Sequence, residues 1–103
     1  MRVSRRRFER AVTQALGGVP ERFRPYLDDI EFLTADSSGR GLFGLYEGAG
    51  ALGGGAWPAR ITLFRRAHAE RCRTWPELVE EVRRTVLHEL GHHFEMEEDD
   101  LPY

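Results

Sequence analysis

The residues best suited to chemistry lie near the C-terminal end of the chain, in the stretch His88-Glu89-Leu90-Gly91-His92. Histidines four positions apart lie one turn apart on the same helix face, so both imidazoles can reach one metal ion. Zinc favours such nitrogen ligands, and a catalytic zinc site takes three protein ligands and a water. Glu89 flanks the metal and can take a proton from that water. The pattern predicts a Zn²⁺ site on His88 and His92 with Glu89 as general base, and Gly91 leaves room beside the metal.

The third metal ligand must come from elsewhere, and the acidic tail after His92 is the nearest source of carboxylates. If the chain turns back after the helix, the residue six positions beyond His92 meets the ion. This favours Glu98 as the ligand, with Asp99 as the alternative. Another acidic tail residue, an upstream residue, another chain, a water or a solvated tail stays open. His93 points about 100° away from His92, so we expect it beside the metal ligands or on the surface.

The helix that must carry these residues has the strongest local signal in the chain. Thr74-Trp75-Pro76-Glu77 matches a capping box, and apolar residues then recur at helical spacing. We therefore expect an amphipathic helix over about 75–94, with His88 and His92 at the border of its apolar stripe and facing a cleft. The preceding segment, 67–73, is expected to be a linker with at most a helical turn. A histidine in such a linker, His68, is more often solvated than a metal ligand.

The remaining elements are shorter. Ser4 and Gly17-Gly18 bound a predicted amphipathic helix over 5–16, and a short helix interrupted by Pro25 follows from about 20 to 27. Alternating polar and apolar residues predict strands at 28–34 and 59–65, and the residues 42–46 between them are interpreted as a further strand. Gly44 inside the second strand indicates a bulge or a close backbone approach. The arginines of the third strand suit an exposed edge of the sheet. The glycine-rich segment 47–58 lacks a P-loop ending and is expected to be a surface connection or a flap beside the substrate.

Composition sets the wider limits. The 103 residues make one domain, 1–103, and a net charge of -2 gives no global basic field for nucleic acid. Five arginines among the first ten residues favour a solvated helix face over a nucleic-acid contact, so no nucleic-acid partner is expected. The opening Ser4-Arg5-Arg6-Arg7-Phe8 resembles a twin-arginine export signal, but the residues after it make a poor apolar core for one. A lone cysteine, Cys72, and no run as apolar as a membrane span favour a cytoplasmic protein.

Several segments together resemble the small bacterial zincin-like metallopeptidases. They are Phe8-Glu9, Ala15-Leu16, Pro20, Phe23, Gly44-Leu45-Tyr46-Glu47-Gly48, the stretch 58–66 and the stretch 85–94. The resemblance implies an α+β fold, a minimal zincin with N-terminal helices, a small mixed sheet of about three to four strands and a C-terminal active-site helix. It also implies a pattern H-E-x-x-H-x-x-G-x-x-D, in which His88, Glu89 and His92 match. This chain has Glu95 where that pattern has Gly and Glu98 where it has Asp, so the turn to the third ligand must form differently.

The sequence therefore predicts a zinc metallopeptidase acting on a peptide or protein substrate. We expect the substrate to pair with an edge strand over 60–65, and Tyr46 or Tyr103 is a candidate to stabilise the oxyanion. The alternative is a catalytically silent metal-binding zincin-like domain with a structural or regulatory role. The small size of the chain and the altered Glu95 and Glu98 favour that alternative. The oligomeric state is left open.

Overall fold

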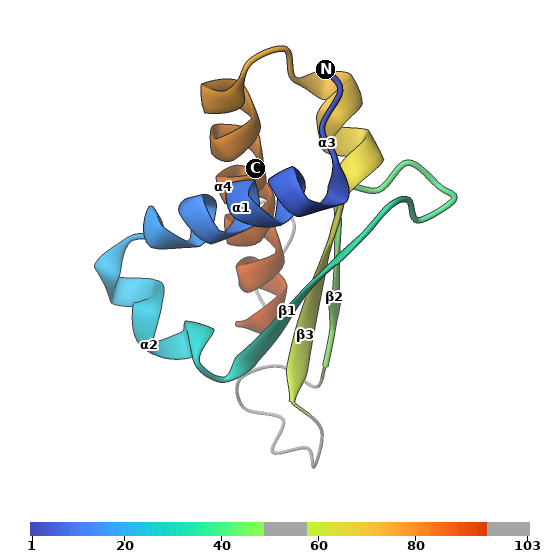
Figure 1. Ribbon diagram of the computed structural model, residues 1–103. Coiled ribbons are helices and arrows are strands. Elements are labelled where there is room, and N and C mark those ends of the chain that lie inside the picture. Colours follow the sequence, from blue (N-terminus) through green and yellow to red (C-terminus); the bar gives the residue numbers. More distant parts are fainter. Residues whose placement is uncertain (49–57, 95–103) are drawn as a thin grey trace.

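The computed structural model describes residues 1–48 and 58–94 (Figure 1). Within these residues, four α-helices and one 3₁₀ turn accompany a three-stranded mixed sheet, as the α+β prediction required. The elements are, in chain order, α1 (Arg5–Gly17), η1 (Glu21–Phe23), α2 (Arg24–Leu27), β1 (Ile30–Ala35), β2 (Gly44–Glu47), β3 (Ala59–Phe64), α3 (Arg65–Arg71) and α4 (Trp75–His93).

The order of strands in the sheet is β1-β3-β2. β3 pairs in parallel with β1 and antiparallel with β2, so Ile61 lies between Phe32 and Tyr46. The prediction that the third strand forms an edge is therefore wrong, since both sides of β3 are hydrogen-bonded. Its alternation was read correctly, because Ile61 and Leu63 are fully buried while Arg60 is exposed. Among the described residues, β1 and β2 form the two edges.

The long helices α1 and α4 lie against one another and cover the sheet (Figure 1). Each starts at a predicted cap: the Ser4 hydroxyl accepts a hydrogen bond from the Arg7 amide, and the Thr74 hydroxyl accepts one from the Glu77 amide. The most deeply buried side chains of the core, at most 2 % exposed, include Phe8, Ala11, Ala15, Ile61, Leu63, Leu78, Val82, Val86 and Leu90. Burying each large apolar side chain contributes about 1.5–3 kcal/mol, so this contact holds α4 in place over the sheet.

Two short helices differ in detail from what the sequence predicted. Segment 67–73, predicted to hold at most a helical turn, falls largely within the seven-residue helix α3, which begins directly where β3 ends. Pro25 does not interrupt a helix; it sits in the first turn of α2, where the missing amide proton is harmless. α2 lies near the C-terminal end of α4. There the Tyr26 and Phe94 rings pack edge-on, with 4.7 Å between their centroids.

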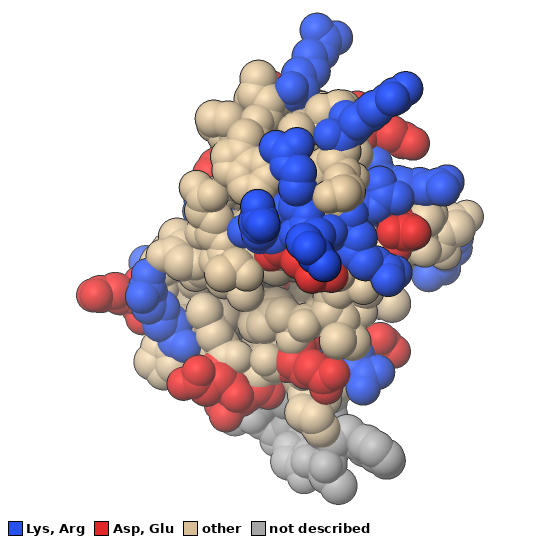
Figure 2. All heavy atoms as spheres, viewed as in Figure 1, with Lys and Arg blue, Asp and Glu red and all other residues tan. Residues whose placement is uncertain are grey.

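The N-terminal segment is docked onto α3. The Met1 amine donates to the carbonyl oxygens of Ala69 and Cys72, at 2.6 and 3.0 Å, and Val3 is buried. This contact brings the arginine-rich start of the chain next to α3, which also carries arginines. Arginine side chains gather in the upper half of Figure 2. The arginines of α1 are exposed, as expected for a solvated helix face. No helix in the described residues is long and apolar enough to cross a membrane.

Candidate metal centre

The C-terminal half of α4 brings three potential metal-binding side chains together. His88, Glu89 and His92 each offer a ligand atom, and these atoms all lie within 4.8 Å of one another. The two imidazole rings are 5.3 Å apart between centroids, as the spacing of one helical turn dictates. Both histidines are half-buried and Glu89 is buried, so the group lies at the border of the apolar stripe, where it was predicted.

A close approach between β2 and α4 shapes the space next to this group. A methyl group on Gly44 would lie 2.7 Å from Thr85 Cγ2 and 3.2 Å from Glu89 Cγ, so only glycine fits here. Of the bulge or close backbone approach predicted at Gly44, the structure shows a close approach, made mainly by these two side chains of α4. Beside it lies a pocket of about 240 Å³ lined by Leu42, Phe43, Gly44, Thr85, His88 and Glu89. A small group could therefore reach both Glu89 and one of the histidines from this side.

A family model for zincin-like metallopeptidases matches residues 24–103, which is most of the chain. The chain belongs to the zincin-like metallopeptidase family. No curated protein matches it. Membership of this zincin family implies a divalent metal, typically zinc, and a peptidase-like function. The donor set fits that metal, because two imidazoles one helical turn apart and a nearby carboxylate are typical surroundings of zinc.

The third histidine of α4, His93, is only 4 % exposed and contacts Tyr46 of β2. Its Nδ1 is hydrogen-bonded to the Tyr46 hydroxyl at 2.9 Å. Burial lowers the pKa of His93 and the Asp29 carboxylate partly opposes that shift, so the neutral ring is favoured. Of the two expected positions for His93, beside the metal ligands or on the surface, the second is wrong. Tyr46 reaches α4 through this bond, and its expected role toward an oxyanion stays a prediction.

His68 is fully buried, which corrects the expectation of a solvated histidine in a linker. Its Nδ1 lies 2.8 Å from the Phe64 carbonyl oxygen and its Nε2 lies 2.8 Å from the Thr85 hydroxyl. Both ring nitrogens are thus occupied, so His68 does not belong to the metal group. Burial lowers its pKa to about 4, which keeps the ring neutral near pH 7.

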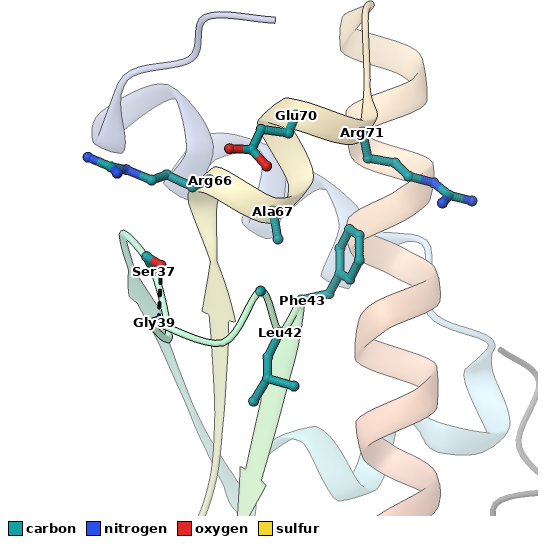
Figure 3. A pocket seen from close by; sticks show the side chains of 9 residues that line it. Ser37, Gly39, Leu42, Phe43, Arg66, Ala67, Glu70 and Arg71 are labelled. Atoms are coloured by element: carbon teal, nitrogen blue, oxygen red, sulfur yellow. Dashed lines mark hydrogen bonds between the residues drawn. The ribbon is translucent and has the colours of Figure 1, made fainter.

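A second pocket, of about 470 Å³, lies between α3 and the segment before β2 (Figure 3). It shares Leu42 and Phe43 with the pocket beside Glu89, so the two hollows adjoin at these residues. Its other lining residues include Arg66, Glu70 and Arg71, and Figure 3 shows the two arginines pointing to opposite sides. This mixed charge gives no clear preference for a ligand.

The structure brings together His88, Glu89 and His92 as the sequence predicted, whereas Glu98, Asp99 and Tyr103 lie outside the described residues. Sequence reasoning missed Thr85, although its position four residues before Glu89 places it on the same helix face. It also missed the contact between His68 and Thr85, for which the sequence holds no local signal because the partners lie on different helices.

Proposed function

We propose that the protein is a zinc-dependent peptidase in which His88 and His92 hold the metal and Glu89 is the general base. The observation that carries this proposal is the cluster of these three side chains beside the pocket under Gly44. The proposed reaction, hydrolysis of a peptide bond at a divalent metal, is the one expected of the zincin-like metallopeptidase family to which the chain belongs. We assign the third ligand to Glu98, with Asp99 as the alternative, because a catalytic zinc site normally takes three protein ligands.

Zinc bound at this site would lower the pKa of a coordinated water to about 7 and polarise the substrate carbonyl. The chain itself supplies the proton transfer. Glu89 is buried next to the histidines, so its carboxylate can accept a proton from the attacking water and donate it to the departing amine. Because Gly44 has no side chain, Glu89 can pack directly against the start of β2. The general base is thereby kept close to any peptide that pairs with β2.

The substrate is expected to lie along β2. An extended peptide can add to a sheet only at an edge strand, where backbone groups are not already paired. The predicted pairing of the substrate with residues 60–65 is wrong, because β3 is the central strand of the sheet. β2 is an edge among the described residues, and Gly44 at its start contacts the helix that carries Glu89. We therefore expect the scissile bond near Gly44.

The test compares zinc content and peptide cleavage in the wild-type protein and in the variants Glu89→Gln, His88→Ala and Glu98→Ala. Glu89→Gln should keep the metal and lose turnover by at least about a hundredfold, in the range for removal of a general base. His88→Ala should lose both. Glu80→Gln is the matched control, because Glu80 lies on the same helix and pairs with Arg83 away from the metal group.

The same experiment addresses the alternative of a catalytically silent domain. Stoichiometric zinc without cleavage of a mixed peptide library would support that alternative and overturn the peptidase assignment. Full activity in Glu89→Gln would show that another group is the base. Unchanged zinc affinity in Glu98→Ala would remove Glu98 from the ligand set and direct attention to Asp99.

A further inference from the structure

Thr85 lies one helical turn before Glu89 and is only 2 % exposed. Its Cγ2 methyl and the Cγ of Glu89 both lie within 3.2 Å of the point where a side chain on Gly44 would begin. The methyl and the stem of the glutamate therefore share the narrow space between α4 and β2. Thr85 also lines the pocket that His88 and Glu89 line. The methyl thus forms one wall of the space in which Glu89 must be held.

The orientation of that methyl depends on His68. The Phe64 carbonyl can only accept a hydrogen bond, so Nδ1 of the neutral ring carries the proton. Nε2 is left to accept from the Thr85 hydroxyl at 2.8 Å. In helices threonine populates two side-chain rotamers, and the bond to His68 favours the one seen here. The other rotamer would move the methyl away from Gly44.

His68 itself has little freedom to move. Its ring is fully buried, with the Phe8 ring centroid at 5.5 Å and the Phe43 ring edge-on at 5.1 Å. The Glu81 carbonyl oxygen, at 3.0 Å, is a second acceptor for the one proton of the Thr85 hydroxyl and is reached in this same rotamer. A rigid ring on α3 thereby fixes one side chain on α4.

We propose that Thr85, oriented by His68, is a positioning residue that keeps the stem of Glu89 against Gly44 in the geometry needed for proton transfer. This inference rests on the proposed role of Glu89. It assigns to α3 a direct part in the site, although no residue of α3 belongs to the metal group. The competing explanation is that the buried hydrogen bonds stabilise the fold and leave the geometry of Glu89 unaffected.

The first experiment measures the contact without turnover. In the zinc-loaded wild-type protein, NMR should show a nuclear Overhauser effect between the Thr85 methyl and the Gly44 α protons. In His68→Leu the effect should weaken, because the hydroxyl then has only carbonyls of its own helix as acceptors, which it can reach from both rotamers. The zinc dissociation constant should change by less than about twofold, since the imidazoles of His88 and His92 are untouched. An undiminished effect in His68→Leu would overturn the role of His68.

The second experiment separates the methyl from the hydroxyl. Thr85→Ser keeps the hydrogen bond and deletes the methyl, so kcat should fall about tenfold with KM within about twofold, as expected for a misplaced base. Thr85→Val keeps a methyl toward Gly44 and should lose less kcat than the serine variant but more thermal stability. Thr13→Ser is the matched control, because Thr13 bonds the Glu9 carbonyl in the same way on the exposed side of α1.

Wild-type kcat in Thr85→Ser would overturn this inference and leave the peptidase assignment standing. The same holds if Thr85→Val loses as much kcat as Thr85→Ser, because a methyl kept toward Gly44 would then not preserve the geometry of Glu89. If the wild-type protein shows no Glu89-dependent turnover, the proposed function fails and the positioning role fails with it. A rescue of His68→Leu by adding Thr85→Val, whose two methyls make rotation harmless, would support the orienting role of His68.

Discussion

Substitution of Gly44 by alanine probes the contact on which the site depends. The new Cβ would lie 2.7 Å from Thr85 Cγ2 and 3.2 Å from Glu89 Cγ. Carbon atoms in good contact are about 3.5–4.0 Å apart, so β2 and α4 would have to separate by roughly 1 Å. Overpacking of this kind costs about 1–3 kcal/mol. Replacing a strand glycine also gains about 0.5–1 kcal/mol of backbone entropy, so we expect a net loss of about 1–2 kcal/mol.

Urea unfolding of the Gly44→Ala variant measures this loss, and peptide cleavage measures its effect on Glu89. A displacement of about 1 Å at the base should lower kcat by about tenfold or more. Gly17→Ala is the control, because a methyl there meets no atom within 4 Å and the residue lies at the end of α1. That variant should be as stable as the wild type or more stable by up to about 1 kcal/mol.

Deleting the methyl that Gly44→Ala collides with should relieve the strain. The double variant Gly44→Ala/Thr85→Ser should therefore be more stable than the sum of the two single effects requires. If Gly44→Ala is as stable as the wild-type protein, or if the two substitutions are simply additive, the contact between β2 and α4 is not as tight as described. The proposed placement of the Glu89 stem against Gly44 would then be wrong as well.

Two further predictions concern stability. Burial lowers the pKa of His68 from 6.5 to about 4, so between these pH values the unfolded chain takes up a proton that the folded protein does not. Stability should thus decrease by about 3 kcal/mol as the pH falls from 6.5 to 4, and urea titrations should show a smaller decrease for His68→Leu. Thr74→Ala removes the hydroxyl that caps α4 and should cost about 1 kcal/mol of unfolding free energy. An unchanged urea midpoint in Thr74→Ala would mean that this hydrogen bond does not contribute to the free energy of unfolding.

Local features of the sequence predicted the parts of the fold that local physics decides. The capping box at Thr74 and the spacing of Leu78, Val82 and Val86 fix the start and the buried face of α4 whatever surrounds them. The positions of His88, Glu89 and His92 on one helix follow from the same periodicity. This part of the site could be placed in advance because all three residues lie within five positions.

Strand order could not be predicted in this way. An alternating strand such as Ala59–Phe64 reads the same at the edge of a sheet as at its centre when one face is open to solvent. Its exposed arginine was therefore taken as the sign of an edge, although Arg60 lies on the open face, near Glu31 of β1. The buried state of His68 escaped for a related reason, since its partner Thr85 is 17 positions away.

The place of α1 has a consequence for how this family is cut into fragments. The family match begins at residue 24, yet α1 ends at Gly17 and supplies Phe8, Ala11 and Ala15 to the core. A recombinant fragment that starts at residue 24 would lack α1 and leave part of the apolar face of α4 uncovered. The stretch of this chain that the family model matches is thus shorter than the stretch that builds its core, and expression trials should be designed on the second.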